Sequence, residues 1–455
     1  MNAKNKFSNY LLLMSLLALS VFGCKDDDNA PAIAVDLVSQ EDASVPLEWM
    51  KLYLEIDRYL QDFRPGPTAR ALAYINLAAY ESSMKGMLGF KSLSSLYSGL
   101  DLPAAEDKEY HYPTVVNAVY ANLFKRFLPG GYIVSSQQSN LQFKILELEE
   151  SNNEAFRSME GPTVFDRSQA YGEAVATAVW DWAKTDPFGH DAHLLARPEG
   201  YSPPVGPGLW TPTPPQFSRA LFPYWGNART FAISESEKLA KEPFSFSEEN
   251  TSQFYAQALE VRNTVSNLEF NDQWIAEFWN DENVSETFSP AAHWISIANQ
   301  VVEEDGANLE TALYAYTMVS LALNDAGIAA SNSKYVYNVE RPVTFINRVL
   351  DATWAPHQEL TPDSPSYPSC HAVMGAAAAE VLSYVFGYNH PLTDNSHEGR
   401  TDFLGMPRSF DTFYQMADEN ASSRIKMGAS FGMDVEEGLR LGYQIGRKVN
   451  QMPFK

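Results

Sequence analysis

Apolar residues recur along most of the chain at the spacing of an amphipathic α-helix. After Pro46, the large apolar side chains stand at positions i, i+3, i+4, i+7 and i+11, which places them on one helical face: Trp49, Leu52, Tyr53, Ile56 and Leu60. The sequence RPGPT at 64–68 ends this helix, and the next begins at 69. Further helices are predicted at 113–128, 134–160, 168–184, 250–268, 271–281 and 288–304. No sustained run alternates between apolar and polar residues, so the pattern predicts an all-α fold built of helical bundles.

Prolines and glycines interrupt the helical pattern between Pro187 and Pro223. Aromatic residues are interleaved with them and follow them: Trp210, Phe217, Phe222, Tyr224 and Trp225. This aromatic content predicts an ordered loop, a lid or rim near a pocket, in preference to a disordered linker. We therefore divide the mature chain into an N-terminal helical half, 45–240, and a C-terminal half, 241–455.

The N-terminus has the pattern of an export signal. Lys4 and Lys6 precede an apolar run that is too short to span a membrane comfortably, and the run closes on Gly23-Cys24. VFGC resembles a bacterial lipobox, and the following KDDDNA resembles the acidic tag of surface lipoproteins of Bacteroidetes. Residues 1–23 are thus predicted as a lipoprotein signal peptide, Cys24 as the lipidated residue and 24–44 as a tether. The alternative is a plain cleaved signal without an anchor.

Composition narrows the classes of partner. A hydrophobic content of 45% with 13% aromatic residues excludes a disordered chain. A formal charge of −24 argues against nucleic acid or an anionic membrane surface, so contact with a membrane is expected only through the lipid anchor. The chain has two cysteines, so lipidation of Cys24 leaves one free thiol, and stability must come from core packing.

Three segments of the C-terminal half place cations and hydroxyls near helix ends. Lys334 and Arg341 are two helical turns apart, and Pro342 forces a break directly after them. Ser369 precedes an alanine-rich helix, where the N–H groups of Cys370 and His371 point out of a helix N-terminus. Arg424 adds a third cation. These groups together suit a tetrahedral oxyanion, because three buried cations are intolerable without an anion between them.

The same residues resemble a known superfamily. K-x6-R-P at 334–342, P-S-x-H at 368–371 and S-R at 423–424 match the three-part signature of the vanadium-dependent haloperoxidases and type 2 phosphatidic acid phosphatases. The resemblance implies an all-α bundle in which Lys334, Arg341, Ser369, Cys370 and Arg424 hold vanadate. It assigns acid–base chemistry to the histidine of the second motif, and hydrogen peroxide and a halide as substrates. In the phosphatases the same residues hold phosphate, and the substrate is a phosphate ester.

Two positions depart from the pattern. Ser430 stands where the family has the axial vanadium ligand, the histidine that is the nucleophile in the phosphatases, while Asp434 keeps the family's aspartate and could equally cap the last helix with Glu437. Cys370 replaces a glycine, so its Cβ could crowd the oxyanion, or its thiol among cations could ionise easily and act as a nucleophile. We expect a haloperoxidase whose activity is weak, altered or lost. The alternatives are a phosphate-ester hydrolase and a non-catalytic oxyanion-binding lipoprotein at the cell surface.

No metal site is predicted from the histidines. His190 and His193 have the spacing of one helix face, but no third ligand is evident and the flanking proline and glycine favour a loop. His397 is placed near the pocket by the family resemblance alone.

Overall fold

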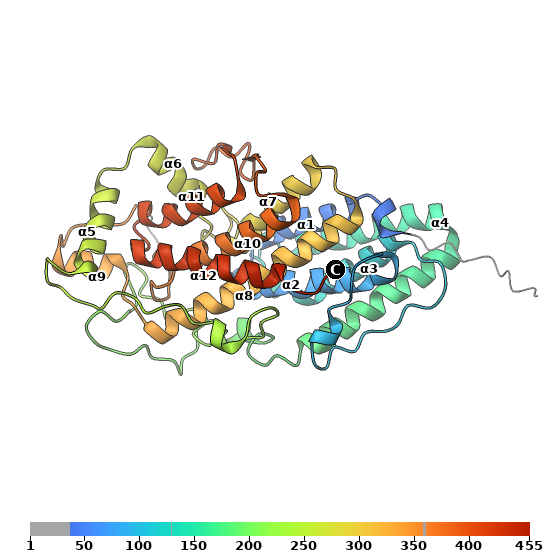
Figure 1. Cartoon of the computed structure of the whole chain (residues 1–455), viewed down its shortest axis with the longest axis horizontal. Helices are drawn as coiled ribbons and strands as arrows, with labels where there is room; N and C mark the ends of the chain where they lie inside the picture. The colour runs from blue at the N-terminus through green and yellow to red at the C-terminus, as the bar shows by residue number, and fades with distance from the viewer. Residues whose placement is uncertain (1–36, 129, 358–360) are drawn as a thin grey trace, which may run out of the picture. The chain divides into compact units, whose positions relative to one another are not determined.

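Twelve α-helices build the part of the chain that the computed structural model describes, residues 37–128, 130–357 and 361–455 (Figure 1). They are α1 (Ser44–Arg58), α2 (Gly66–Ser82), α3 (Tyr112–Phe127), α4 (Gln138–Ala183), α5 (Gln253–Ser266), α6 (Phe270–Phe278), α7 (Pro290–Glu304), α8 (Leu309–Tyr337), α9 (Pro342–Val349), α10 (Cys370–Phe386), α11 (Phe413–Lys426) and α12 (Gly432–Asn450). Within these ranges the only sheet pairs β1 (Leu392–Asp394) with β2 (Arg408–Phe410), antiparallel. The predicted all-α fold is confirmed.

The N-terminal predictions fall largely outside the described residues. The signal peptide and Cys24 lie there, as does most of the tether. Val38, near the end of the predicted tether, lies in a short 3-10 helix and is fully buried. None of the described helices is long and apolar enough to cross a membrane.

The helices predicted at 134–160 and 168–184 both lie in the range of α4, which joins two helices across a break. Its backbone leaves the helical region at Gly161, where φ is +74°, and Pro162 follows. Glycine tolerates this left-handed conformation, so the chain bends there and helix resumes on both sides. The prediction of two helices is therefore confirmed, and only the width of the gap was wrong, because helix resumes directly after Gly161 and not at 168.

The centre of the fold is α8, whose residues are buried along nearly its whole length. It packs against α2 from the N-terminal half and against α10 and α12 from the C-terminal half. The boundary at 240 stays a prediction, but helices from both sides of it share this core.

Small residues bring α10 and α12 into close contact. Gly438, Gly442 and Gly446 recur every four residues on α12 and face α10. A Cβ at Gly442 would lie 2.2 Å from the carbonyl oxygen of Val373, which no side chain can accept. This close approach fixes the N-terminus of α10 against the start of α12, where two of the three sequence motifs lie.

The proline-rich segment is an ordered loop, as predicted. Trp210 is fully buried, and its backbone N–H donates to the carbonyl of Asn338 at 2.7 Å. The backbone N–H of Leu221 donates to the carbonyl of Asp363 at 2.8 Å. These bonds hold the loop against the segments that follow α8 and α9, beside the candidate site.

Candidate oxyanion-binding site

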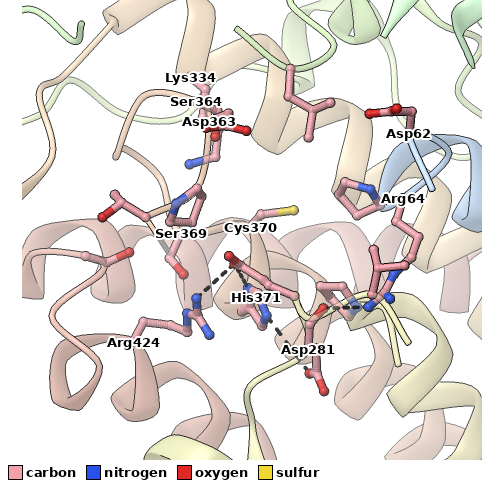
Figure 2. Close-up of a pocket in the computed structure, with 18 of the residues that line it drawn as sticks. Asp62, Arg64, Asp281, Lys334, Asp363, Ser364, Ser369, Cys370, His371 and Arg424 are labelled. Carbon is pink, nitrogen blue, oxygen red and sulfur yellow. Dashed lines mark hydrogen bonds and ion pairs between the residues drawn. The ribbon is translucent and has the colours of Figure 1, made fainter. Parts of the chain in front are cut away.

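One cavity of about 520 Å³ collects the predicted site residues (Figure 2). Seven of the eight residues predicted from the three motifs line it: Lys334, Arg341, Ser369, Cys370, His371, Arg424 and Ser430. We call the first six of these residues the cradle. The volume is that of a site for a small ligand.

Two cations come from the junction of α8 and α9. Lys334 lies in the last turn of α8, and its Nζ donates to the carbonyls of Pro365 (2.7 Å) and Ser366 (2.9 Å). Arg341 is the N-cap of α9 and donates from Nη1 to the carbonyl of Ala429 at 2.9 Å. The two cations do not share one helix, as the sequence suggested, because α8 ends at Asn338 in the left-handed conformation (φ 49°).

Burial and mutual repulsion weaken the protonated forms of these cations. Burial, followed by the charge of Arg341, lowers the pKa of Lys334 to about 7. Burial likewise lowers the pKa of Arg341 to about 10, and Arg424 adds to the effect. For Arg341 the charges of Glu282 and Asp434 oppose the effect of burial. The surplus of positive charge follows from the lining of the cavity, which among the described residues has five cationic side chains against four carboxylates.

The N-terminus of α10 forms the floor of the cavity. Ser369 is its N-cap, as predicted, and its Oγ accepts the N–H of Ala372 at 3.4 Å. Cys370 is the first residue of the helix, and Figure 2 shows its sulfur pointing into the cavity. Burial raises the pKa of this thiol even though Lys334, Arg424 and Arg341 act against it. The expectation that Cys370 ionises easily is therefore wrong: desolvation outweighs the nearby cations.

His371 lies behind Cys370 and is buried. Its Nδ1 is 3.7 Å from Oε1 of Glu282, and its Nε2 is 4.0 Å from Oδ2 of Asp281. Burial, with the charges of Arg424 and Lys334, holds the pKa of His371 well below its ordinary value. The imidazole is therefore neutral, and the same effects make it a weak base as long as no anion offsets the neighbouring cations.

Glu282 and Asp281 are site residues that sequence reasoning missed. They lie between α6 and α7, and both line the cavity. Arg424, in the last turn of α11, donates from Nη2 to Oε1 of Glu282 at 2.9 Å. The segment has no periodicity and none of the three motifs, so only its acidic pair between aromatic residues could have marked it.

The third motif continues into a tight turn. Ser430 lines the cavity, and its N–H donates to the carbonyl of Arg424 at 3.2 Å. Asp434 lies one layer behind, fully buried, where it accepts the N–H of Phe431 (2.8 Å) and the hydroxyl of Ser366. Burial raises the pKa of Asp434 to about 6, against these hydrogen bonds.

The predicted cap with Glu437 required Asp434 to be the residue just before the last helix, and the structure contradicts this. Helix α12 begins at Gly432, so Asp434 is its third residue and reaches back to the N–H of the N-cap, Phe431. Its backbone carbonyl also accepts the N–H of Ser369 at 3.0 Å. Asp434 therefore joins the second and third motifs and has no contact with the cavity of its own.

The rim of the cavity comes from the proline-rich loop and the α1–α2 connection. Arg197 donates from Nη1 to Oδ2 of Asp363 at 2.9 Å and is 3.7 Å from Oδ1 of Asp62. All three residues and Leu221 line the cavity, so the prediction of a rim near a pocket is confirmed. His190 and His193 of the same loop pack against aromatic rings, Trp180 and Tyr132.

The cradle fits a tetrahedral oxyanion. Three cations and a helix N-terminus surround the cavity, whereas Glu282 is the one carboxylate paired to any of these cations in the described ranges. Lys334 and Arg341 use part of their N–H donors on backbone carbonyls, which leaves further donors for a ligand. Position 430, beside the cradle, is a serine and supplies no imidazole.

Comparisons with known proteins concern the family and the fold of the chain. A family model of the second helical-bundle domain of VCPO matches residues 314–454. A structure described as the first bacterial vanadium-dependent iodoperoxidase is 29% identical, with a TM-score of 0.77 over 90% of this chain and 96% of that chain. No curated protein sequence matches the chain.

A holo-type bacterial vanadium-dependent chloroperoxidase is 16% identical, with a TM-score of 0.63 over 90% of this chain and 97% of that one. At this identity the likeness concerns the fold alone. The fold is thus the helical fold of the vanadium haloperoxidases. The family model and the iodoperoxidase structure, together with the three motifs, support the vanadium haloperoxidase and type 2 phosphatidic acid phosphatase superfamily for this chain.

Proposed function

We propose that the cavity binds vanadate and that the chain oxidises iodide with hydrogen peroxide, at a rate limited by Ser430. One observation carries the proposal: three motifs, spread along the sequence from Lys334 to Ser430, converge on one cavity with surplus positive charge. Iodide is the halide of choice because the similar structure at 29% identity is described as an iodoperoxidase.

The residues of the cradle have separate tasks. Lys334, Arg341 and Arg424 would neutralise the oxyanion, while Ser369 and the N–H groups at the start of α10 would orient it. Bound vanadate would supply the activation of peroxide toward halide. A bound anion would offset the charges of Arg424 and Lys334 that lower the pKa of His371, and its Nδ1, on the side of Glu282, would then accept a proton from hydrogen peroxide.

Ser430 is the residue that we expect to limit the rate of iodide oxidation. A neutral hydroxyl is a weak ligand compared with an imidazole, so the cradle holds the oxyanion through charge and hydrogen bonds alone. The same substitution removes the nucleophile that a phosphate-ester hydrolase of this superfamily uses. A non-catalytic oxyanion-binding protein is the second candidate, and Ser430 is the observation that favours it.

The test uses the purified protein with vanadate, hydrogen peroxide and iodide, beside the Ser430→His variant. We expect slow triiodide formation by the wild type and a rate at least tenfold higher for the variant. Orthophosphate should compete with vanadate in both. Absence of turnover in both proteins, with tight phosphate binding by calorimetry, would replace the proposal with the binding function. Release of phosphate from p-nitrophenyl phosphate by the wild type would favour the hydrolase.

We also propose that the protein is anchored outside the cytoplasm through Cys24. The proposal rests on the export pattern of the N-terminus. Expression in a Bacteroidetes host with a labelled fatty acid should label the wild type and leave Cys24→Ser unlabelled. Equal labelling of both proteins would contradict the assignment.

A further inference from the structure

A buried group of histidines and aspartates lies directly behind the cradle. His293 on α7, Asp281 before α7 and His397 in the β1–β2 connection are each at most 1% exposed. One ligand atom from each of the three lies within 4.8 Å of the other two. With Asp394 they form what we call the Asp/His cluster.

Each histidine of the cluster has one ring nitrogen held by an acceptor. Nε2 of His293 is 3.1 Å from Oδ2 of Asp394, and Nε2 of His397 is 3.2 Å from the carbonyl oxygen of Phe278. Asp394 is itself oriented by Gln300, whose Nε2 donates to Oδ1 at 3.1 Å. Metal-binding histidines have this arrangement, because an acceptor on one nitrogen fixes the tautomer that offers the other.

Two buried polar atoms of the cluster lack a hydrogen bond in the described part of the chain. Among the described residues, neither Nδ1 of His397 nor Oδ2 of Asp281 has a hydrogen-bond partner. Nδ1 of His293 is 2.8 Å from Oδ1 of Asp281, so without a further ligand His293 is an imidazolium between two carboxylates. That ion triad leaves the two unpaired atoms unexplained, although buried polar groups are nearly always satisfied.

We propose that Asp281, His293 and His397 bind a divalent transition-metal ion such as Zn²⁺. The ion replaces the proton that His293 shares with Asp281, and that proton passes to solvent. A divalent ion with neutral histidines balances the charges of Asp281 and Asp394, whereas the imidazolium leaves one carboxylate uncompensated. Two imidazoles and a carboxylate favour a borderline metal over Ca²⁺ or Mg²⁺, which prefer oxygen ligands.

The position of the site gives it a role beyond packing. Asp281 lines the cavity, so the ion can enter from there. The three ligands come from separate segments, and the ion would tie them together. It would also fix the carboxylate whose Oδ2 lies 4.0 Å from Nε2 of His371.

The experiment measures metal content directly. Purified full-length protein is treated with a chelator, reloaded with Zn²⁺ or Co²⁺ and desalted, and the metal is counted by mass spectrometry. We expect one ion per wild-type chain, a visible absorption spectrum of low-symmetry bound Co²⁺, and less than one tenth of an ion in His397→Ala. His397 is the residue to change because the triad of Asp281, His293 and Asp394 survives its removal.

Two further variants distinguish loss of the metal site from loss of the folded structure. His390→Ala is the control, because His390 pairs with Asp305 at 3.1 Å outside the cluster and should leave one ion per chain. Asp394→Asn keeps all three ligands and should weaken Zn²⁺ binding 10- to 100-fold. Far-ultraviolet circular dichroism checks that each variant is folded. Wild-type protein that retains no metal, or folded His397→Ala that retains as much as the wild type, would overturn the site. Neither measurement uses vanadate or peroxide, so the result is independent of the proposed function.

Discussion

The cradle and the Asp/His cluster are adjacent, buried and charged, but their charges are arranged in opposite ways. In the cradle burial and repulsion lower the pKa of Lys334 to about 7. In the cluster burial also opposes charge, yet Asp281 and Asp394 outweigh it and raise the pKa of metal-free His293 to about 10. A site with surplus cations binds an external anion at a cost in stability, whereas a site with paired charges holds its own segments together.

The largest effect should come from removing the cation of the cluster. We expect His293→Leu, measured in chelator-treated protein, to lower the free energy of unfolding by about 3–5 kcal/mol, because two buried carboxylates lose their partner. Urea unfolding followed by circular dichroism measures it. The exposed lysine of a surface pair, Lys51→Leu, is the control and should cost less than about 1 kcal/mol. An equal loss of unfolding free energy in the two variants would contradict the claim that the cation of the cluster stabilises the fold.

The second effect concerns the cradle. Arg341→Ala should weaken sulfate or phosphate binding at least 100-fold, or about 2.7 kcal/mol. Its free energy of unfolding should fall by no more than about 1–2 kcal/mol, because the lost hydrogen bonds to Ser364 and Ala429 are offset by relief of the desolvation of Arg341 and of its repulsion with Lys334. Isothermal titration calorimetry measures the anion affinity, and urea unfolding measures the free energy of unfolding.

A matched control lies seven residues further on. Arg348, on α9, pairs with Glu340 and Glu248 and is 41% exposed in its side chain. Arg348→Ala should leave anion affinity within twofold of the wild type. Anion binding that survives in Arg341→Ala would place the binding site elsewhere.

These two regions also differ in how far the sequence predicts them. The cradle residues precede or follow helix ends in three short motifs, so residue type and spacing are enough to predict an oxyanion site. The Asp/His cluster joins a loop at 281, a helix at 293 and a turn at 397, and only the packing of α6, α7 and the β1–β2 connection brings them together. Glu282 was missed for the same reason, since no periodicity marks a residue between two helices.

In the fold, too, some features are predicted by the sequence and others are not. Apolar spacing predicted most helices and the all-α class, because burial of one face leaves a pattern with a period of 3.6 residues. Apolar spacing did not predict the exact ends of the helices, because a single residue there decides where a helix begins or ends. Asn338 ends α8 before Arg341, and α12 begins at Gly432, two residues before Asp434. Cys370 shows the limit for chemistry: its neighbours are visible in the sequence, but the desolvation that raises its pKa is not.

The third prediction uses pH. Because the pKa of Lys334 is about 7 in the free protein and a bound anion raises it, sulfate affinity should fall up to tenfold per pH unit above pH 7. Sulfate keeps its charge throughout, so calorimetry between pH 6 and 9 reports the protein alone. Asp434, with a pKa of about 6, titrates at the lower edge of this window, below the range above pH 7 where the fall is expected, and the Cys370 thiol titrates above its ordinary value. Lys334→Arg stays protonated and should show a flat profile; an unchanged slope in this variant would assign the titration to another group.

The smallest effect tests whether Cys370 crowds the cradle. Its sulfur points into the cavity from the first residue of α10, where the superfamily has glycine. Cys370→Gly should raise sulfate affinity two- to fivefold and lower the free energy of unfolding by about 0.5–1 kcal/mol, since glycine loses more backbone entropy. Cys370→Ala keeps Cβ and removes only the sulfur, so it separates the two sources of crowding: equal gains in both variants implicate the sulfur, and a gain in the glycine variant alone implicates Cβ. No gain in either would mean that Cys370 is tolerated, and that Ser430 alone distinguishes this cradle from the superfamily pattern. The effect is small because Cys370 changes the room available to the anion and leaves the surplus of cations in place.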